Sequence, residues 1–224
     1  MRSSLDIKKQ KMTPTTLMDH TVIDRFDPNS IIVDLGANKG EFASLFSKTY
    51  RFQKMILVEA NPHLLPDIER NIGKTKNVEV LNAVIGTSNQ EEASFFISDA
   101  HDASSINEDF SKGTFAKNSF NTNEIKQRML TLESLMEEYG LDKIDFLKVD
   151  IEGAEWELIE SFTPALCDKI DQISVEFHDF YGEQFRPKSE KCINKLKDMG
   201  YQFTCKGTDF EQGSPYFDCL FYKE

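Results

Sequence analysis

Short apolar runs alternate with amphipathic stretches along most of this chain. Runs of buried-strand character are predicted at residues 31–35, 54–59, 78–82, 144–149 and 173–178. Apolar positions recur at helical spacing in the intervening and following stretches, with helices expected from Glu41, Pro62, Thr131 and Ser189, and another, after the fourth run, that ends at about Phe162. This alternation favours a doubly wound α/β fold with a mostly parallel sheet.

Several segments lie outside this alternation. Residues 92–97 and 125–130 are predicted as short extra strands, and the polar segment 98–124 between them as a long ordered loop or partial lid. Residues 201–206 and 217–222 have the pattern of a closing hairpin, which would add an antiparallel strand to the sheet.

The amino-terminal stretch is predicted to be helical. Thr13-Pro14 has the form of a helix start. An apolar stripe at helical spacing follows, made by Leu17, Met18, Val22 and Phe26. We therefore expect a helical extension over residues 1–29 and a single domain over 30–224, with His20 on a helix and without a role.

The length and the charge of the chain limit the classes of function that it can have. The 224 residues suffice for one α/β domain with a substantial core. The chain contains neither an apolar stretch that could span a bilayer nor a secretory segment, so we expect a cytoplasmic protein without membrane contact. The formal net charge of −12 opposes binding to the phosphates of nucleic acids, which favours a small acceptor. The four cysteines form no Cys-x-x-Cys pair and predict neither a zinc site nor a disulfide framework.

A glycine turn follows the first buried strand and indicates a nucleotide-like cofactor. Gly36 and Gly40 let the backbone approach a ligand at the point where the strand gives way to a helix. The middle glycine of the dinucleotide pattern is missing, and Asp34 would repel a diphosphate. A ligand with an ammonium and a sulfonium group suits this acid, and S-adenosylmethionine has both.

The next strand also ends in an acid, Glu59. It lies about 20 residues after the first glycine, where a carboxylate can accept hydrogen bonds from both ribose hydroxyls. The alternative is an exposed acid at a strand end. Two acids in the right order favour the cofactor interpretation.

Four motifs occur together and in order: Val33-Asp34-Leu35-Gly36-Ala37-Asn38-Lys39-Gly40, Val58-Glu59-Ala60-Asn61-Pro62, Asn82-Ala83-Val84-Ile85-Gly86 and Leu147-Lys148-Val149-Asp150-Ile151-Glu152-Gly153-Ala154-Glu155. Over residues 30–180 the chain resembles the FkbM-type family of class I S-adenosylmethionine-dependent methyltransferases. The resemblance implies a seven-stranded sheet with an antiparallel strand near one edge. It also implies O-methylation of a hydroxyl on a sugar or another small metabolite.

The resemblance also implies roles for individual residues. Asp34 would hold the cofactor's ammonium group, directly or through water, and Asp150 would lie beside its sulfonium. Glu59, with Ala60 next to it, would bind the ribose. The methionine part and the adenine would be contacted by Gly36, Ala37, Asn38 and Gly40 and by Asn82 and Ala83, respectively.

An alcohol acceptor needs a base near the transferred methyl group, and the strand ends supply candidates. These are Asp150, Glu152, Glu176 and His178. His178 is the natural choice because the ordinary pKa of histidine lies near neutrality, although it could instead be a hydrogen-bonded strand-end residue. For Glu152, the pattern favours an acid in the first turn of the helix that it precedes over a direct catalytic role.

Other interpretations stay open at this point. A divalent ion could bind a cluster of Asp150, Glu176, His178 and Asp179, although no dedicated ligand motif predicts one. A nicotinamide-dependent oxidoreductase would share the sheet and the ribose-binding acid. A catalytically silent cofactor-binding protein would keep the glycine turn, but the acids near the methyl group would be dispensable.

Overall fold

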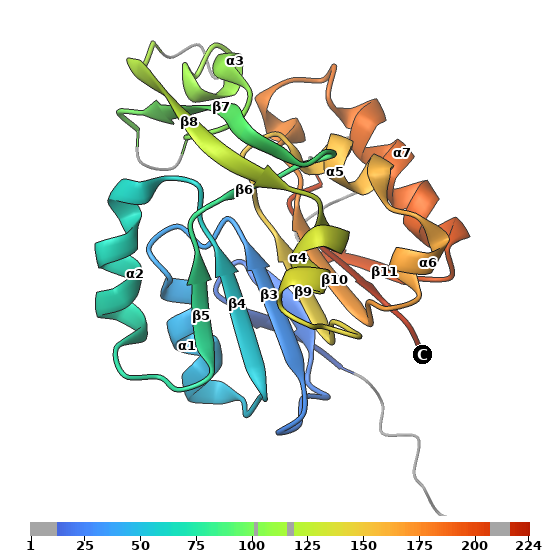
Figure 1. The fold of residues 1–224 in the computed structure, drawn as a ribbon. Coiled ribbons are helices and arrows are strands. Elements are labelled where there is room, and N and C mark those ends of the chain that lie inside the picture. Colours follow the sequence, from blue (N-terminus) through green and yellow to red (C-terminus); the bar gives the residue numbers. More distant parts are fainter. Residues whose placement is uncertain (1–12, 101–102, 116–118, 207–215) are drawn as a thin grey trace, which may run out of the picture.

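The computed structural model describes residues 13–100, 103–115, 119–206 and 216–224, and its centre is a seven-stranded sheet (Figure 1). The strand order is β11-β12-β10-β9-β3-β4-β5. The strands from β10 to β5 run parallel, and β12 lies antiparallel between β10 and β11. The bounds in that order are Gln202–Lys206, Asp218–Tyr222, Gln172–Glu176, Phe146–Val149, Ile31–Leu35, Lys54–Val58 and Val78–Leu81. The predicted doubly wound, mostly parallel sheet with an antiparallel strand near one edge is confirmed.

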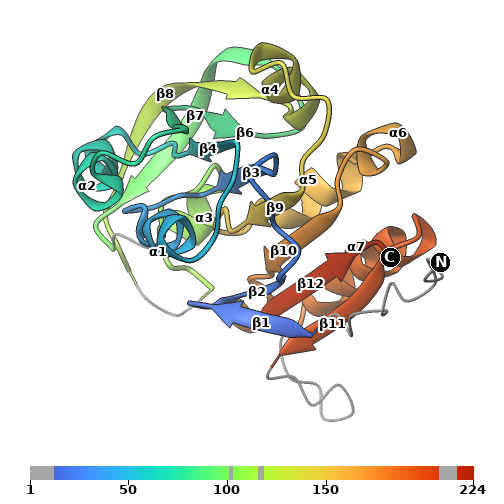
Figure 2. The same ribbon diagram turned by 90° about the horizontal axis from the view of Figure 1, so that it is seen from below.

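Helices cover both faces of this sheet (Figure 2). One face packs against α1 (Glu41–Thr49) and α2 (Leu65–Ile72), and aromatic side chains such as Phe46 and Phe146 fill the space between them. The other face packs against α4 (Leu132–Glu138), α5 (Glu155–Ser161), α6 (Pro164–Cys167) and α7 (Arg186–Asp198). Among the described residues, the helices are too short or too polar to cross a membrane.

The helix predicted to begin at Thr13 is wrong. Residues 14–23 form a β-hairpin, β1 (Pro14–Leu17) and β2 (His20–Ile23), while residues 1–12 of the predicted extension lie outside the described part of the chain. The segment is rich in β-branched residues, which favour strands over helices. The hairpin packs across β10 and β12, and Asp218 of β12 anchors it by accepting hydrogen bonds from the backbone N–H and the hydroxyl of Thr21, at 2.8 and 2.5 Å.

A second, three-stranded sheet stands over the carboxyl edge of the first one (Figure 1). It contains β6 (Val84–Ile85), β7 (Gln90–Ser98) and β8 (Thr122–Leu130), so both predicted extra strands are confirmed but are longer than expected. The described part of segment 98–124 includes a short helix, α3 (Glu108–Ser111), whose Phe110 is buried against Trp156 of α5. Residues 101–102 and 116–118 of this predicted loop lie outside the described part of the chain.

We predict that replacing Asp218 with alanine loosens the hairpin. The substitution leaves two buried donors of Thr21 without their acceptor, which should lower the free energy of unfolding by about 1–3 kcal/mol for each unsatisfied group. Urea denaturation measures the loss. The matched control is Glu138→Gln, which breaks an exposed ion pair with Arg128 and should cost less than about 1 kcal/mol. Equal stability of the two variants would contradict the anchoring role.

Candidate active site

The glycine turn after β3 is built for close approach of two strand ends. Gly36 has a φ of 77° and Asn38 a φ of 49°, both in the left-handed region. A Cβ added to Gly36 would lie 1.7 Å from the backbone oxygen of Asp150, at the end of β9. Only glycine fits this position, because the adjacent strands approach too closely for a side chain.

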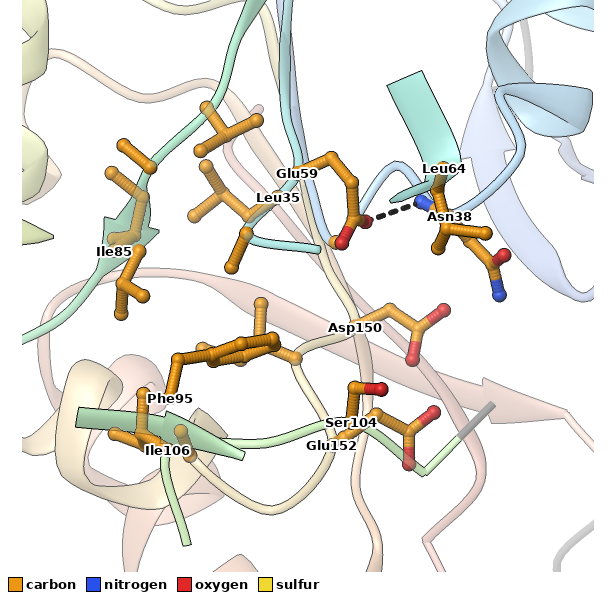
Figure 3. Close-up of a pocket in the computed structure, with 17 residues that line it drawn as sticks. Leu35, Asn38, Glu59, Leu64, Ile85, Phe95, Ser104, Ile106, Asp150 and Glu152 are labelled. Atoms are coloured by element: carbon orange, nitrogen blue, oxygen red, sulfur yellow. Dashed lines mark hydrogen bonds between the residues drawn. The ribbon is translucent and has the colours of Figure 1, made fainter. Parts of the chain in front are cut away.

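Glu59 leaves β4 and turns its carboxylate toward this glycine turn. One oxygen accepts the N–H of Asn38 at 2.8 Å (Figure 3), and the other accepts the N–H of Asn61 at 2.7 Å. Burial raises the pKa of Glu59 to about 7, against the opposing effect of the two hydrogen bonds. Each carboxylate oxygen has a second acceptor position, so Glu59 can still bind two hydroxyl groups of a ligand.

The strand ends and the second sheet enclose a cavity of about 640 Å³, its open mouth included, which we call the strand-end cavity. Figure 3 shows apolar side chains of Ile85, Phe95 and Ile106 at one end and carboxylates of Asp150 and Glu152 at the other. This mixture of an apolar wall with a few polar groups is usual for sites that hold a cofactor. The predicted site residues that line the cavity are Gly36, Asn38, Glu59, Ala60, Ala83, Asp150 and Glu152.

A second cavity adjoins the first on the side of the β1–β2 hairpin, and we call it the hairpin-side cavity. Gly36, Asn38 and Asp150 line both cavities. Ala37, His20, Lys148 and Glu176 line the second one, among others. Burial and the charge of Asp150 raise the pKa of Glu176 to about 8.

Three predicted cofactor residues lie behind these walls. Asp34 is fully buried, and its carboxylate lies 3.0 Å from the ammonium of Lys148. Asn82 donates hydrogen bonds to the carbonyls of Glu59 and Ala60, so it positions the cavity wall from outside. Gly40 precedes α1 and lies against Ile68.

Lys148 links the two carboxylates of this edge. Its ammonium lies 3.0 Å from Asp34 and 3.3 Å from Asp150, and it donates a hydrogen bond to the carbonyl of Gly36 at 3.0 Å. Burial alone would lower the pKa of Lys148, but the two carboxylates outweigh it and raise the pKa, so the side chain stays charged. Burial would likewise raise the pKa of Asp150, and the charge of Lys148 holds it below its usual range.

His178 is buried beneath the turn that follows β9. Its Nε2 lies 3.1 Å from Glu152 and its Nδ1 lies 3.0 Å from Glu155. Burial opposes a charge on the ring, but the two carboxylates raise the pKa of His178 well above its ordinary value. A protonated ring with both nitrogens engaged cannot accept a proton. The geometry therefore favours a positioning role for His178 over the predicted role of general base.

The turn that His178 supports carries Glu152 in a left-handed conformation, with a φ of 52°. Glu155 is fully buried and accepts the N–H groups of Ile151 and Gly153 at 3.0 and 3.1 Å. The hydroxyl of Ser105 donates to the carbonyl of Glu152 at 2.6 Å. Together these contacts hold the carboxylate of Glu152 at the cavity wall, although the backbone conformation is unfavourable for a side chain.

Sequence reasoning missed two residues of this edge. Lys148 had a usable signal, because a lysine in the middle of a buried strand must have charged partners. His20 had none, because its position on a strand beside Asp150 depends on the hairpin that was predicted as a helix.

A seven-stranded sheet with this antiparallel strand, and a cavity at its switch point, define a class I methyltransferase fold. Residues 34–203 match the family model of the methyltransferase FkbM domain. The chain belongs to the FkbM methyltransferase family, as its motifs predicted, and this membership replaces the oxidoreductase alternative.

Two relatives and one solved structure are similar to this chain. Methyltransferase 1 of Beauveria bassiana is 26% identical over 171 residues, which are 70% of this chain and 68% of that protein. AMB antimetabolite synthetase AmbE of Pseudomonas aeruginosa is 21% identical over 220 residues, and the match covers 86% of this chain but only 10% of that protein. The structure of SMU.1697c from Streptococcus mutans, in complex with SAH, has a TM-score of 0.51 at 9% identity and covers 88% of this chain and 90% of that chain. At such identity the likeness supports the fold alone.

We predict that His178→Ala destabilises the protein by about 3–5 kcal/mol. The substitution leaves Glu152 and Glu155 close together without the cation between them. Chemical denaturation measures the effect, with the exposed His63→Ala as the control that should change stability by less than about 0.5 kcal/mol.

A second substitution separates charge from packing. Adding Glu152→Gln to the His178→Ala variant removes one of the two unpaired carboxylates and should restore part of the stability. No recovery in the double variant would show that the ring acts by packing and not by its charge.

Proposed function

We propose that the protein binds S-adenosylmethionine across the two adjoining cavities and methylates a hydroxyl group of a small acceptor, such as a sugar or another metabolite. The observation that carries this proposal is Glu59, whose two oxygens are fixed by backbone N–H groups and face the strand-end cavity. A carboxylate held in this way suits the paired hydroxyls of a ribose.

The remaining walls fit the other parts of this cofactor. The apolar end of the strand-end cavity, with Val84, Ile85 and Phe95, suits the adenine ring. The turn of Gly36 and Asn38 opens to both cavities, where the methionine part can pass from one to the other. Asp150 lines both cavities and is negatively charged, which favours the ammonium and sulfonium groups and opposes a pyrophosphate.

When it is bound, the sulfonium group supplies an activated methyl group. The chain must then align the acceptor, exclude water and remove the proton of the hydroxyl. Glu152 is the carboxylate best placed to take this proton, because it lies on the cavity wall next to Asp150 (Figure 3). Burial raises the pKa of Glu152 above its ordinary value, which makes it a stronger base than an exposed glutamate. His178 keeps it in place from below.

We infer a small acceptor from charge and from two exposed rings. A net charge of −12 opposes a nucleic acid substrate. Phe180 and Phe217 are 42% and 40% exposed, with ring centres 5.8 Å apart, and Phe180 also contacts His178. Exposed aromatic rings next to His178, which holds Glu152 in place, offer a contact surface for the ring of a sugar-sized molecule.

The pH dependence of cofactor binding tests the assignment of Glu59. Ribose hydroxyls donate to the ionised carboxylate, so binding requires Glu59 to lose its proton. With a pKa of about 7, the affinity for S-adenosylhomocysteine should fall as the pH is lowered below neutrality, by up to about tenfold per pH unit. Isothermal titration calorimetry from about pH 8 to about pH 5 measures this trend.

The control is Glu59→Gln. It should weaken binding by about 1.5–3 kcal/mol and remove most of the pH dependence, because the amide does not titrate in this range. NAD should give no binding signal with either protein. A pH-independent affinity of the natural protein, or binding of NAD without S-adenosylhomocysteine, would contradict the proposal.

The proton-accepting role is tested with Glu152→Gln. The amide can keep the contact with His178 but cannot take a proton, so turnover should fall by about 10²–10⁴-fold while the affinity for S-adenosylhomocysteine stays nearly unchanged. A panel of hydroxylated sugars and metabolites, read by the release of S-adenosylhomocysteine, supplies the assay. Undiminished turnover would assign the proton to another group, and the absence of turnover with every acceptor would favour a silent binding protein.

A further inference from the structure

We propose that His20, Asp150 and Glu176 form a binding site for one divalent transition-metal ion, for which Mn²⁺ is a suitable probe. The three residues come from the hairpin, from the end of β9 and from the end of β10. A ligand atom of each lies within 4.8 Å of the others.

The spacing suits a single ion after a small closure. Ligand atoms about 2.1 Å from an ion are about 3.0 Å apart when adjacent and about 4.2 Å apart when opposite, in octahedral geometry. The Nε2 of His20 and the carboxylate of Asp150 are 3.7 Å apart, within this range. One imidazole with two carboxylates is a donor set that Mn²⁺ accepts, whereas Mg²⁺ prefers oxygen alone.

The histidine is oriented from behind, as metal-binding histidines usually are. His20 is only 4% exposed, and its Nδ1 lies 3.3 Å from the hydroxyl of Ser174. This contact occupies the inner nitrogen and leaves Nε2 directed at Asp150.

The charges of the surrounding residues also balance a divalent ion. The buried ion pair of Asp34 and Lys148 cancels itself. Asp150 and Glu176 then bring two carboxyl groups to the wall of the hairpin-side cavity, beside a histidine that can bind metal in its neutral form. A 2+ ion between them would be balanced by the two carboxylates, because an ion favours the ionised form of its carboxyl ligands.

A second cluster, of Asp150, Glu152 and His178, is less suitable. Its ligand atoms are equally close, but both nitrogens of His178 already face carboxylates, one of them from Glu155. Asp179, which the sequence suggested as a ligand, accepts the N–H of Tyr216 at 2.9 Å and does not join either cluster.

The site faces the hairpin-side cavity, which His20, Asp150 and Glu176 all line. An acceptor hydroxyl bound to the ion would lose its proton more readily, since a divalent metal lowers the pKa of an oxygen ligand. This role, unlike the binding of the ion, rests on the proposed methyl transfer.

The test is a titration of the full chain with Mn²⁺ after removal of metals by EDTA and dialysis, followed by electron paramagnetic resonance of the free ion. We expect one Mn²⁺ per chain. His20→Ala and Glu176→Gln should each weaken binding by at least about tenfold, and Ser174→Ala, which only releases the back of the ring, by about tenfold or more. His63→Ala, an exposed histidine, should bind as the natural protein does.

Thermal melting of each variant shows whether it is folded. If His20→Ala unfolds, Glu176→Gln, which is nearly isosteric, still allows Mn²⁺ binding to be measured. Absence of stoichiometric binding, or equal binding by Glu176→Gln, would overturn the proposal. Calorimetry with S-adenosylhomocysteine on the same samples separates the two ideas. Cofactor binding without Mn²⁺ binding would refute the metal site alone, and Mn²⁺ binding without cofactor binding would refute the proposed function alone.

Discussion

The buried ammonium group of Lys148 connects the central parts of this structure. It lies opposite Asp34 in the register of β3 and β9, and it reaches the carbonyl of Gly36 and the carboxylate of Asp150 beyond the strand ends. Removal of a charge from water is costly, and only partners on several sides make such a burial stable. These contacts therefore hold the ends of β3 and β9 next to each other. Gly36 and Asp150, which Lys148 contacts, form part of the wall that the two cavities share.

The turn after β9 is likewise held by buried charged side chains. Glu155 satisfies two backbone N–H groups of the turn, and His178 joins Glu155 to Glu152. A left-handed residue at position 152 would be unfavourable in isolation. Here the ion pair of Glu152 with His178 and the hydrogen bond from the hydroxyl of Ser105 to the carbonyl of Glu152 stabilise this one conformation.

Much of the fold and half of the site were predictable from the sequence. Strands such as Ile31–Leu35 and helices such as α4 have strong periodicity, and a positive φ at Gly36 follows from the glycine turn. The hairpin had one signal in its β-branched residues, but its few apolar positions fit helical and strand spacing equally well, and its contacts lie on β10 and β12, far along the chain. His178 was correctly placed at the edge, but its chemistry depends on two carboxylates whose approach no spacing reveals.

The anchor of the hairpin has a consequence for the order in which the molecule assembles. Thr21 and Asp218 are 197 positions apart, and β12 enters the sheet between two strands that precede it in the chain. The cost of closing so long a loop is entropic and must be offset by contacts already formed. During synthesis, the residues that line the strand-end cavity are complete at Ala154 and those that line the hairpin-side cavity at Glu176, but the hairpin of the second cavity is anchored only after Asp218 has been made. The two halves of the site are therefore separated in time as well as in space.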